Sequence, residues 1–295
     1  MNLLKNWTLP IAMLVGALGY KVMGYLSFIT PYLIFTMLLL TFSKISLRDL
    51  RPRLSHLYLL CIEIIGAIAI YYLLAPFDSI VAQGMMICII CPTATAAAVV
   101  TGKLGGNVAN ITTYTLLCNI AVAFVIPAIF PIIAPSANHT SFGAAFMHIM
   151  GRIFPLLICP FLLAQLIRWL LPKINAKLTS ISGLAFYMWA IALTIAMGMT
   201  VRSLIEEPTD SHTLILLSIG SLIACLLQFF TGKAIGKASN DTIACGQSLG
   251  QKNTILAIWI CTAYLNPVTA LAPGLYVIWQ NFFNSTQLYL ARKKQ

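Results

Sequence analysis

The sequence predicts an all-α polytopic membrane protein, with ten transmembrane helices in two inverted five-helix repeats. The chain is 60% hydrophobic and only 8% charged, with a mean hydropathy of +0.91. A soluble domain carries about 25% charged residues. Ten apolar segments are each near the ~20 residues that cross a hydrocarbon core. They divide into two sets of five, and because five is odd, the second set enters the membrane from the opposite side.

An outer loop separates the two repeats. The first repeat covers residues 1–134, the second covers 152–295, and 135–151 form an outer linker and interfacial segment. We expect residues 142–151 to lie along the outer interface, with Arg152 at headgroup level. The alternative is an Arg152 buried within the membrane. The expected spans are 7–24, 27–42, 55–74, 80–103, 107–134, 152–171, 181–201, 212–231, 240–263 and 268–290.

The basic residues indicate a topology rather than a nucleic-acid partner, although the net charge is +11. Most of them fall in loops on the same side as the N-terminus. The acids Asp78, Glu206, Glu207 and Asp210 fall on the opposite side. Because positive loops stay in the cytoplasm, both termini are expected there. The short loops favour a bacterial inner membrane, so the lipid bilayer is the expected surrounding.

Two spans are interrupted near their centres, and each is the fourth span of its repeat. In the first of them, Pro92 removes a backbone donor. In the ninth span, glycines and polar side chains at residues 246–253 surround Lys252. A charge near the bilayer centre costs roughly 2.5–3.5 kcal/mol, so such a residue indicates a functional site. Two interrupted spans at corresponding places are typical of the binding site of a secondary transporter.

The restarting half-helices favour an anionic ligand. Their first N–H groups are unpaired and carry the positive end of the helix dipole. The alternative is purely structural. The small residues then only allow close packing, and Thr93 and Thr95 bond back to their own helix.

Three short motifs together resemble the bile acid:sodium symporter family. The resemblance implies a panel domain of spans 1, 2, 6 and 7, and a core domain of spans 3–5 and 8–10. Spans four and nine would cross at their breaks, and the substrates would be organic anions taken up with sodium. The motifs are Cys91-Pro-x-x-Thr-Ala, Gly250-x-x-Asn253 followed by Leu256-Ala257, and Trp279-Gln280-Asn281.

The chain departs from this family at the implied sodium ligands. Ala97 and Ala98 replace a serine and an asparagine, Ile111 replaces a serine, and Ser248 replaces a glutamate, whereas Thr115 is kept. Sodium prefers several oxygen ligands, and the two alanines and the isoleucine supply no side-chain oxygen. We therefore expect the first sodium site to be absent, with no cofactor or metal site in its place.

The second sodium site is expected to be replaced. Lys252 stands where the family has a glutamine, and its ammonium matches the charge of a sodium ion. Glu63 is the only acid deep in the membrane, within about one turn of a sodium-binding position of the family. We hypothesise that Glu63 and Lys252 form an ion pair; in the alternative, each charge snorkels separately to water. Together with Thr115, Ser248 and Gln251, they form the expected ion site or its replacement.

These observations predict a sodium-independent transporter of organic anions, such as bile acid-like carboxylates or sulfonates. One alternative is a sodium- or proton-coupled symporter of a small acid such as pantoate, and another is a membrane sensor that does not transport. The sequence does not indicate the oligomeric state. The expected substrate-binding residues are Thr93, Thr95, Lys252, Asn253, Gln280 and Asn281.

An enzyme is the remaining rival. Gly246-Gln-Ser-Leu-Gly250 matches the G-x-S-x-G pattern of α/β-hydrolases. In those enzymes the acid and the histidine of the triad follow the serine. No Asp, Glu or His follows Ser248 in this chain, so the sequence predicts a protein that is not an enzyme.

Overall fold

The structure is a computed structural model that describes residues 2–134, 141–181 and 183–293. These residues form helices and no strand, as expected in lipid, where a helix satisfies its backbone groups internally. In this described part of the chain, six helical runs are long and apolar enough to cross a membrane, and two shorter apolar helices accompany them. The elements are α1 (Asn2–Leu18), α2 (Tyr20–Leu26), η1 (Ser27–Ile29), α3 (Thr30–Phe42), η2 (Leu47–Asp49), α4 (Leu54–Leu74), α5 (Ser79–Ile90), α6 (Ala97–Lys103), α7 (Val108–Ile133), α8 (Phe142–Leu170), α9 (Pro172–Ser180), α10 (Leu184–Glu206), α11 (Ser211–Ala238), α12 (Thr242–Gly250), α13 (Thr254–Tyr264), η3 (Pro267–Ala270) and α14 (Leu271–Lys293).

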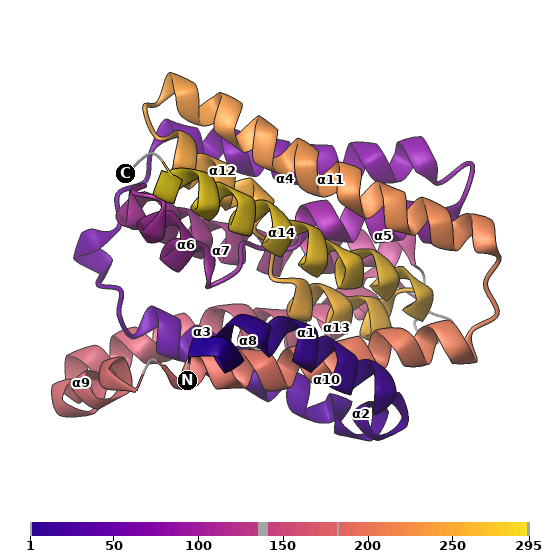
Figure 1. The fold of residues 1–295 in the computed structure, drawn as a ribbon, viewed down its shortest axis with the longest axis horizontal. Helices are drawn as coiled ribbons and strands as arrows, with labels where there is room; N and C mark the ends of the chain where they lie inside the picture. The colour runs from indigo at the N-terminus through magenta and orange to yellow at the C-terminus, as the bar shows by residue number, and fades with distance from the viewer. Residues whose placement is uncertain (1, 135–140, 182, 294–295) are drawn as a thin grey trace.

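The helices form two stacked groups (Figure 1). In the first group, α1 and α2 pack on α10, and α3 packs on α8 and α10. In the second group, α4 packs on α5, and α11 packs on α5, α12 and α14. Helix α13 contacts members of both groups. Segments far apart in the sequence therefore meet where the two groups face each other.

The boundary between the first two spans lies close to where it was expected. The expected gap lay between residues 24 and 27, and α2 ends at Leu26, where the 3-10 turn Ser27–Ile29 separates it from α3. Helices α1 and α2 both pack on α10. The Gly19 N–H donates to the Val15 carbonyl at 2.9 Å and the Met23 N–H donates to the Gly19 carbonyl at 3.0 Å, so helical bonding continues across Gly19. Gly24 has a packing role, because a Cβ there would lie 2.3 Å from a guanidinium nitrogen of Arg202.

Residues 142–151 are not a separate interfacial segment, so the expected boundary at residue 152 is wrong. Helix α8 runs unbroken from Phe142. The Ser141 hydroxyl accepts a hydrogen bond from the Ala144 N–H at 3.3 Å and caps the helix at this early start. Arg152 is exposed on α8 rather than buried. The linker residues 135–140 lie outside the described part of the chain.

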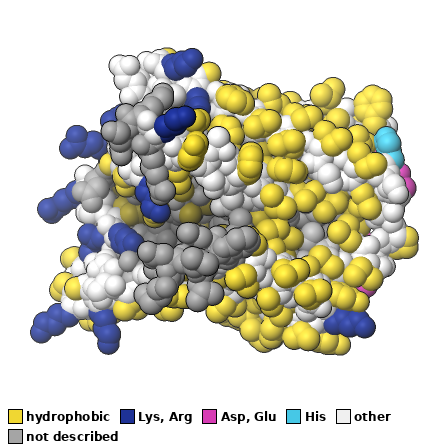
Figure 2. Space-filling view, viewed as in Figure 1, with side chains coloured by type: hydrophobic (Ala, Val, Ile, Leu, Met, Phe, Trp, Pro, Cys, Tyr) yellow, Lys and Arg dark blue, Asp and Glu magenta, His cyan; other side chains and the backbone are white. Residues whose placement is uncertain are grey.

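The charged side chains divide between the two ends of the molecule. Most Lys and Arg side chains in view gather at one end, and the Asp and Glu side chains lie toward the other (Figure 2). The start of α1 and the end of α14 both lie toward the basic end (Figure 1). The basic end comprises α9 and the ends of α3, α6 and α11, with exposed Lys44, Lys103, Lys173, Lys177 and Lys237.

Candidate functional site

The two interrupted segments cross at the centre of the second group. Helix α5 ends at Ile90 and α6 begins at Ala97, while α12 ends at Gly250 and α13 begins at Thr254. The Ala94 N–H donates to the Gln251 carbonyl, and the Asn253 N–H donates to the Pro92 carbonyl, both at 2.8 Å. These bonds form a short antiparallel bridge between Thr93 and Lys252. Each break thereby satisfies backbone groups of the other, as buried non-helical backbone requires.

Neighbouring side chains fix the second break in place. Gln280 on α14 clamps the Lys252 backbone: its Oε1 accepts from the Lys252 N–H at 2.9 Å, and its Nε2 donates to the Lys252 carbonyl at 3.3 Å. The Asn253 Oδ1 accepts from the Leu256 N–H at 3.2 Å and caps α13. Gly250 is required by packing, because a Cβ there would lie 2.3 Å from the Phe229 ring. The break is therefore rigidly held.

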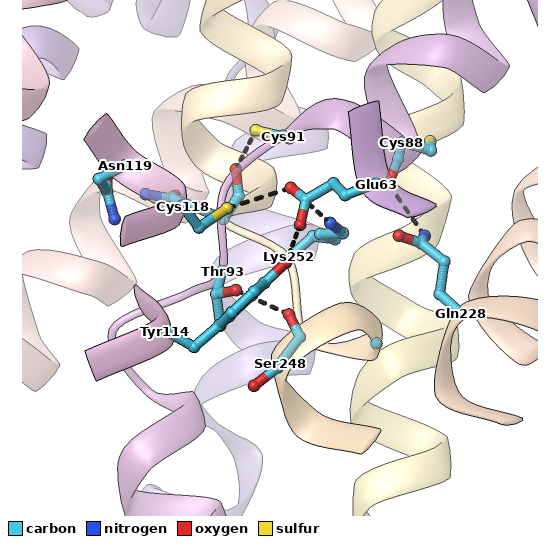
Figure 3. A network of polar contacts seen from close by, with 12 residues as sticks. Glu63, Cys88, Cys91, Thr93, Tyr114, Cys118, Asn119, Gln228, Ser248 and Lys252 are labelled. Carbon is cyan, nitrogen blue, oxygen red and sulfur yellow. Dashed lines mark hydrogen bonds and ion pairs between the residues drawn. The ribbon is translucent and has the colours of Figure 1, made fainter. Parts of the chain in front are cut away.

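Lys252 and Glu63 form a buried ion pair at this crossing (Figure 3). The Lys252 Nζ lies 3.0 Å from the Glu63 Oε1, and their side chains are 1% and 0% exposed. The expected pair is therefore present, and neither side chain snorkels to water. The Tyr114 hydroxyl donates to Glu63 Oε2 at 2.5 Å, and the Cys118 thiol donates to Oε1 at 3.1 Å. The carboxylate thus has three partners from two other segments.

The Lys252 ammonium is less fully satisfied than the carboxylate. Among the described residues, its Nζ has no hydrogen-bond acceptor besides this ion pair. Gln228 on α11 lies in the same close-up (Figure 3), and its amide nitrogen donates to the Cys88 carbonyl at 3.1 Å and to the Tyr276 hydroxyl at 3.0 Å. These bonds tie α11 to α5 and α14 beside the ion pair. Because Glu63 is the only partner of the Lys252 Nζ among the described residues, the ammonium depends on this carboxylate for its charge compensation.

A small pocket lies beside the crossing, where the two groups of helices meet. Its volume is about 60 Å³, and α3 and α10 contribute Met37, Leu38 and Trp189 to its wall. A buried site of this size holds a few water molecules. It is too small for an amphipathic anion in this conformation. Five of the six expected substrate-binding residues line it: Thr95, Lys252, Asn253, Gln280 and Asn281.

Thr93 is the expected substrate-binding residue that the pocket does not include. Its hydroxyl donates to the Ser248 carbonyl at 2.7 Å, across the crossing rather than back to its own helix. The Asn281 amide donates to the Val277 carbonyl one turn earlier, at 2.7 Å. The Lys252 ammonium is buried against Glu63. Thr93 therefore serves the architecture of the crossing in this conformation.

The positions implied for the first sodium site are filled by apolar side chains. Ala97, Ile111 and Ala244 are fully buried and form one cluster, with Ala98 packed against it. The Thr115 hydroxyl donates to the Ile111 carbonyl of its own helix at 2.8 Å. The part of the chain that the structure describes contains no group of three or more His, Cys, Asp or Glu that could hold a metal. Ala97, Ala98 and Ile111 supply no side-chain oxygen at this place.

The remaining ion-site residues contribute backbone rather than side-chain contacts. Ser248 and Gln251 are buried, and their carbonyls accept from the Thr93 hydroxyl and the Ala94 N–H. The side-chain Oε1 of Gln251 is buried and has no hydrogen-bond partner among the described residues. Both residues therefore support the crossing, and only Gln251 also lines the pocket.

A second buried polar network lies toward the basic end, and the sequence did not predict it. The His56 Nε2 contacts the Asn110 Oδ1, and the Asn110 Nδ2 donates to Asp241 Oδ2 at 2.6 Å. The Arg53 guanidinium lies 3.6 Å from the same Asp241 oxygen. The network ties together the starts of α4, α7 and α12. Its signal in the sequence is a set of polar residues at the starts of apolar spans, where helix caps also occur.

Fold and site together define a membrane transporter with two crossing, interrupted segments. Residues 26–292 match the SBF-like CPA transporter family. The chain belongs to this family, which agrees with the resemblance at the coarser level of a transporter.

A curated relative is the uncharacterized sodium-dependent transporter YocS of Bacillus subtilis (strain 168). It is 22% identical over 206 residues, which cover 70% of this chain and 62% of that protein. The match thus spans less than two thirds of the relative. Both the family and this relative are transporters rather than enzymes.

Proposed function

We propose that this protein is a secondary transporter of organic anions that works without sodium, with Lys252 as a resident cation. The observation that carries the proposal is the buried Lys252–Glu63 pair at the crossing, with 3.0 Å between Nζ and Oε1. The Lys252 ammonium supplies at the crossing the positive charge that a bound sodium ion supplies in a sodium-coupled transporter. Replacing a charged ligand by a charged side chain leaves no need for sodium in this place.

The surroundings of the pocket support an anionic substrate. The starts of α6 and α13 border it, with Ala94, Thr95 and Ala96 before one helix and Asn253 before the other. The positive end of the helix dipole at a helix start favours negative charge nearby. No acidic residue is among the residues lining the pocket. A carboxylate or sulfonate is therefore the substrate group that the pocket suits best.

The architecture proposed for transport is alternating access between two inverted five-helix repeats. In this proposal, the first group of helices acts as the panel and the second as the core. Movement of one group against the other opens the pocket to each side in turn and enlarges it for the substrate. The basic end faces the cytoplasm of a bacterial inner membrane, in accordance with the positive-inside rule.

Two observations favour a second candidate function. The printed name of the curated relative contains the words sodium-dependent, and Thr115 and Gln251 retain side-chain oxygens near the crossing. The second candidate is therefore a sodium- or proton-coupled symporter of a small acid such as pantoate. A sensor of such anions would use the same pocket without transport.

The test is uptake of labelled taurocholate and pantoate into vesicles that contain the purified protein. The outer solution holds sodium or choline at the same pH and ionic strength, and empty vesicles are the control. The proposal expects saturable uptake that is equal in sodium and in choline. Uptake only in sodium would support the symporter instead. Saturable binding of either anion without accumulation would support the sensor.

A further inference from the structure

Helix α9 lies at the basic end and packs mainly on α8 (Figure 1). It follows α8 after a change of backbone direction at Leu171, and Pro172 is its first residue. None of the nine residues from Pro172 to Ser180 is buried. Helix α9 thus presents to its surroundings a surface that the described chain does not cover.

One side of α9 is apolar. Ile174, Leu178 and Ile181 are spaced by four and three residues, which places them on one helix face. Ile174 and Ile181 are 47% and 42% exposed, and Trp169 in the last turn of α8 is 79% exposed. Tryptophan is enriched at the headgroup level of membranes. The apolar side of α9 therefore continues the lipid-facing surface of α8 at that level.

Basic side chains flank this apolar face. Lys173 and Lys177 lie one turn apart on α9 and are exposed. The Arg168 guanidinium donates to the Ser43 carbonyl at 2.8 Å, while its Nε is buried without a partner in the described chain. The sequence has no Asp or Glu between residues 142 and 205. Helices α8 and α9 therefore carry no acid that could neutralise Lys173 and Lys177.

We infer that α9 is an interfacial helix that binds the headgroups of anionic phospholipids in the leaflet at the basic end. Its apolar face enters the boundary between headgroups and acyl chains, and Lys173 and Lys177 contact the phosphates. Apolar burial and attraction to anionic lipid together hold such a helix in the interface. Lys103 and Lys237 lie at the same end of the molecule but on α6 and α11, outside this amphipathic helix. They therefore provide a matched comparison of equal charge.

The experiment measures lipid binding to the full-length protein in a neutral detergent. Phosphatidylglycerol and phosphatidylcholine with identical acyl chains are added, and bound lipids are counted by native mass spectrometry alongside the thermal unfolding midpoint. The variants are Lys173→Gln/Lys177→Gln and the control Lys103→Gln/Lys237→Gln. Each basic residue near an anionic surface contributes about fivefold in affinity. The first variant should thus bind phosphatidylglycerol roughly 25-fold more weakly, and the control should bind it like the unchanged protein.

Three results would overturn the inference. The unchanged protein could bind both lipids equally, which would remove any role of headgroup charge. Both double variants could lose affinity to the same extent, which would leave only a general effect of net charge. Inorganic phosphate alone could reproduce the stabilisation, which would point to a free anion rather than a lipid. None of these measurements depends on the transported substrate, so they test the inference separately from the proposed function.

Discussion

At the scale of single residues, Lys252 and Glu63 each depend on the other because both are buried. Removing one charge leaves its partner uncompensated in a medium of low dielectric constant. We expect Lys252→Gln and Glu63→Gln each to lower the free energy of unfolding by roughly 3–5 kcal/mol. Unfolding by SDS in mixed micelles, followed by helical circular dichroism, measures this change.

The double variant and an exposed lysine provide the controls for that measurement. Glu63→Gln/Lys252→Gln should lose less stability than the sum of the single variants, since neither charge is then left alone. Lys237→Gln, at the exposed end of α11, should change stability by less than about 0.5 kcal/mol. If both single variants unfold like the unchanged protein, the pair has no structural importance.

We also expect the protein to lose stability when the Tyr114 hydroxyl is removed. Its hydroxyl donates to the Glu63 carboxylate at 2.5 Å in a fully buried place. A hydrogen bond to a charged group contributes about 1.5–3 kcal/mol, so Tyr114→Phe should lower stability by that amount. The matched control is Tyr71→Phe, which removes a longer bond of 3.3 Å to the Ile133 carbonyl and should cost about 1 kcal/mol or less. Equal losses in the two variants would contradict this difference.

The sequence indicated Glu63 and Lys252 but missed Tyr114 and Cys118. Charges stand out in apolar spans, whereas tyrosine and cysteine are common in membrane helices for packing alone. A faint signal was present: Asn110, Tyr114 and Cys118 repeat every four residues along α7. That spacing marks one face of the helix. It does not say which neighbour the face meets, because the contact with α4 depends on the fold.

At the scale of helices, close packing of α11 on α12 should be sensitive to one glycine. A Cβ at Gly232 would lie 2.3 Å from the Cys245 carbonyl oxygen, which belongs to the backbone and cannot rotate away. Overpacking of this kind costs about 1–3 kcal/mol, so Gly232→Ala should destabilise the protein by that amount in the SDS assay. Gly66 on α4 has no atom near its missing Cβ, and Gly66→Ala should be neutral or stabilising. A neutral Gly232→Ala would show that the two helices separate easily.

The interrupted helices were predictable, but the starts of other helices were not. Proline, glycine and a buried lysine mark the breaks at 91–96 and 251–253 chemically, and the structure has both breaks there. The early start of α8 depends on a single capping serine ahead of an apolar run, which also fits an interfacial segment.

At the scale of the whole molecule, we predict that the folded protein does not need a bound sodium ion. Ala97, Ile111 and Ala244 form a buried apolar cluster, and in the proposed function the Lys252 ammonium, 3.0 Å from Glu63 Oε1, takes the place of a sodium ion. The pocket beside this crossing is lined by α3 and α10 of the first group as well as by the two breaks. Neither the distance between Lys252 and Glu63 nor the apolar cluster is visible in the sequence. The ion pair brings α4 against the second break, and the apolar cluster brings α6 and α7 against α12, so both join segments that are far apart in the sequence.

The most direct test of the resident cation is the stability of the purified protein in sodium and in choline. A ligand that binds only the folded state stabilises it by mass action, so sodium at about ten times its dissociation constant would add about 1.4 kcal/mol. If Lys252 replaces sodium, thermal unfolding in sodium chloride and in choline chloride at equal ionic strength, with no other source of sodium, should give the same midpoint. A midpoint that rises specifically with sodium would show an occupied sodium site and contradict the account.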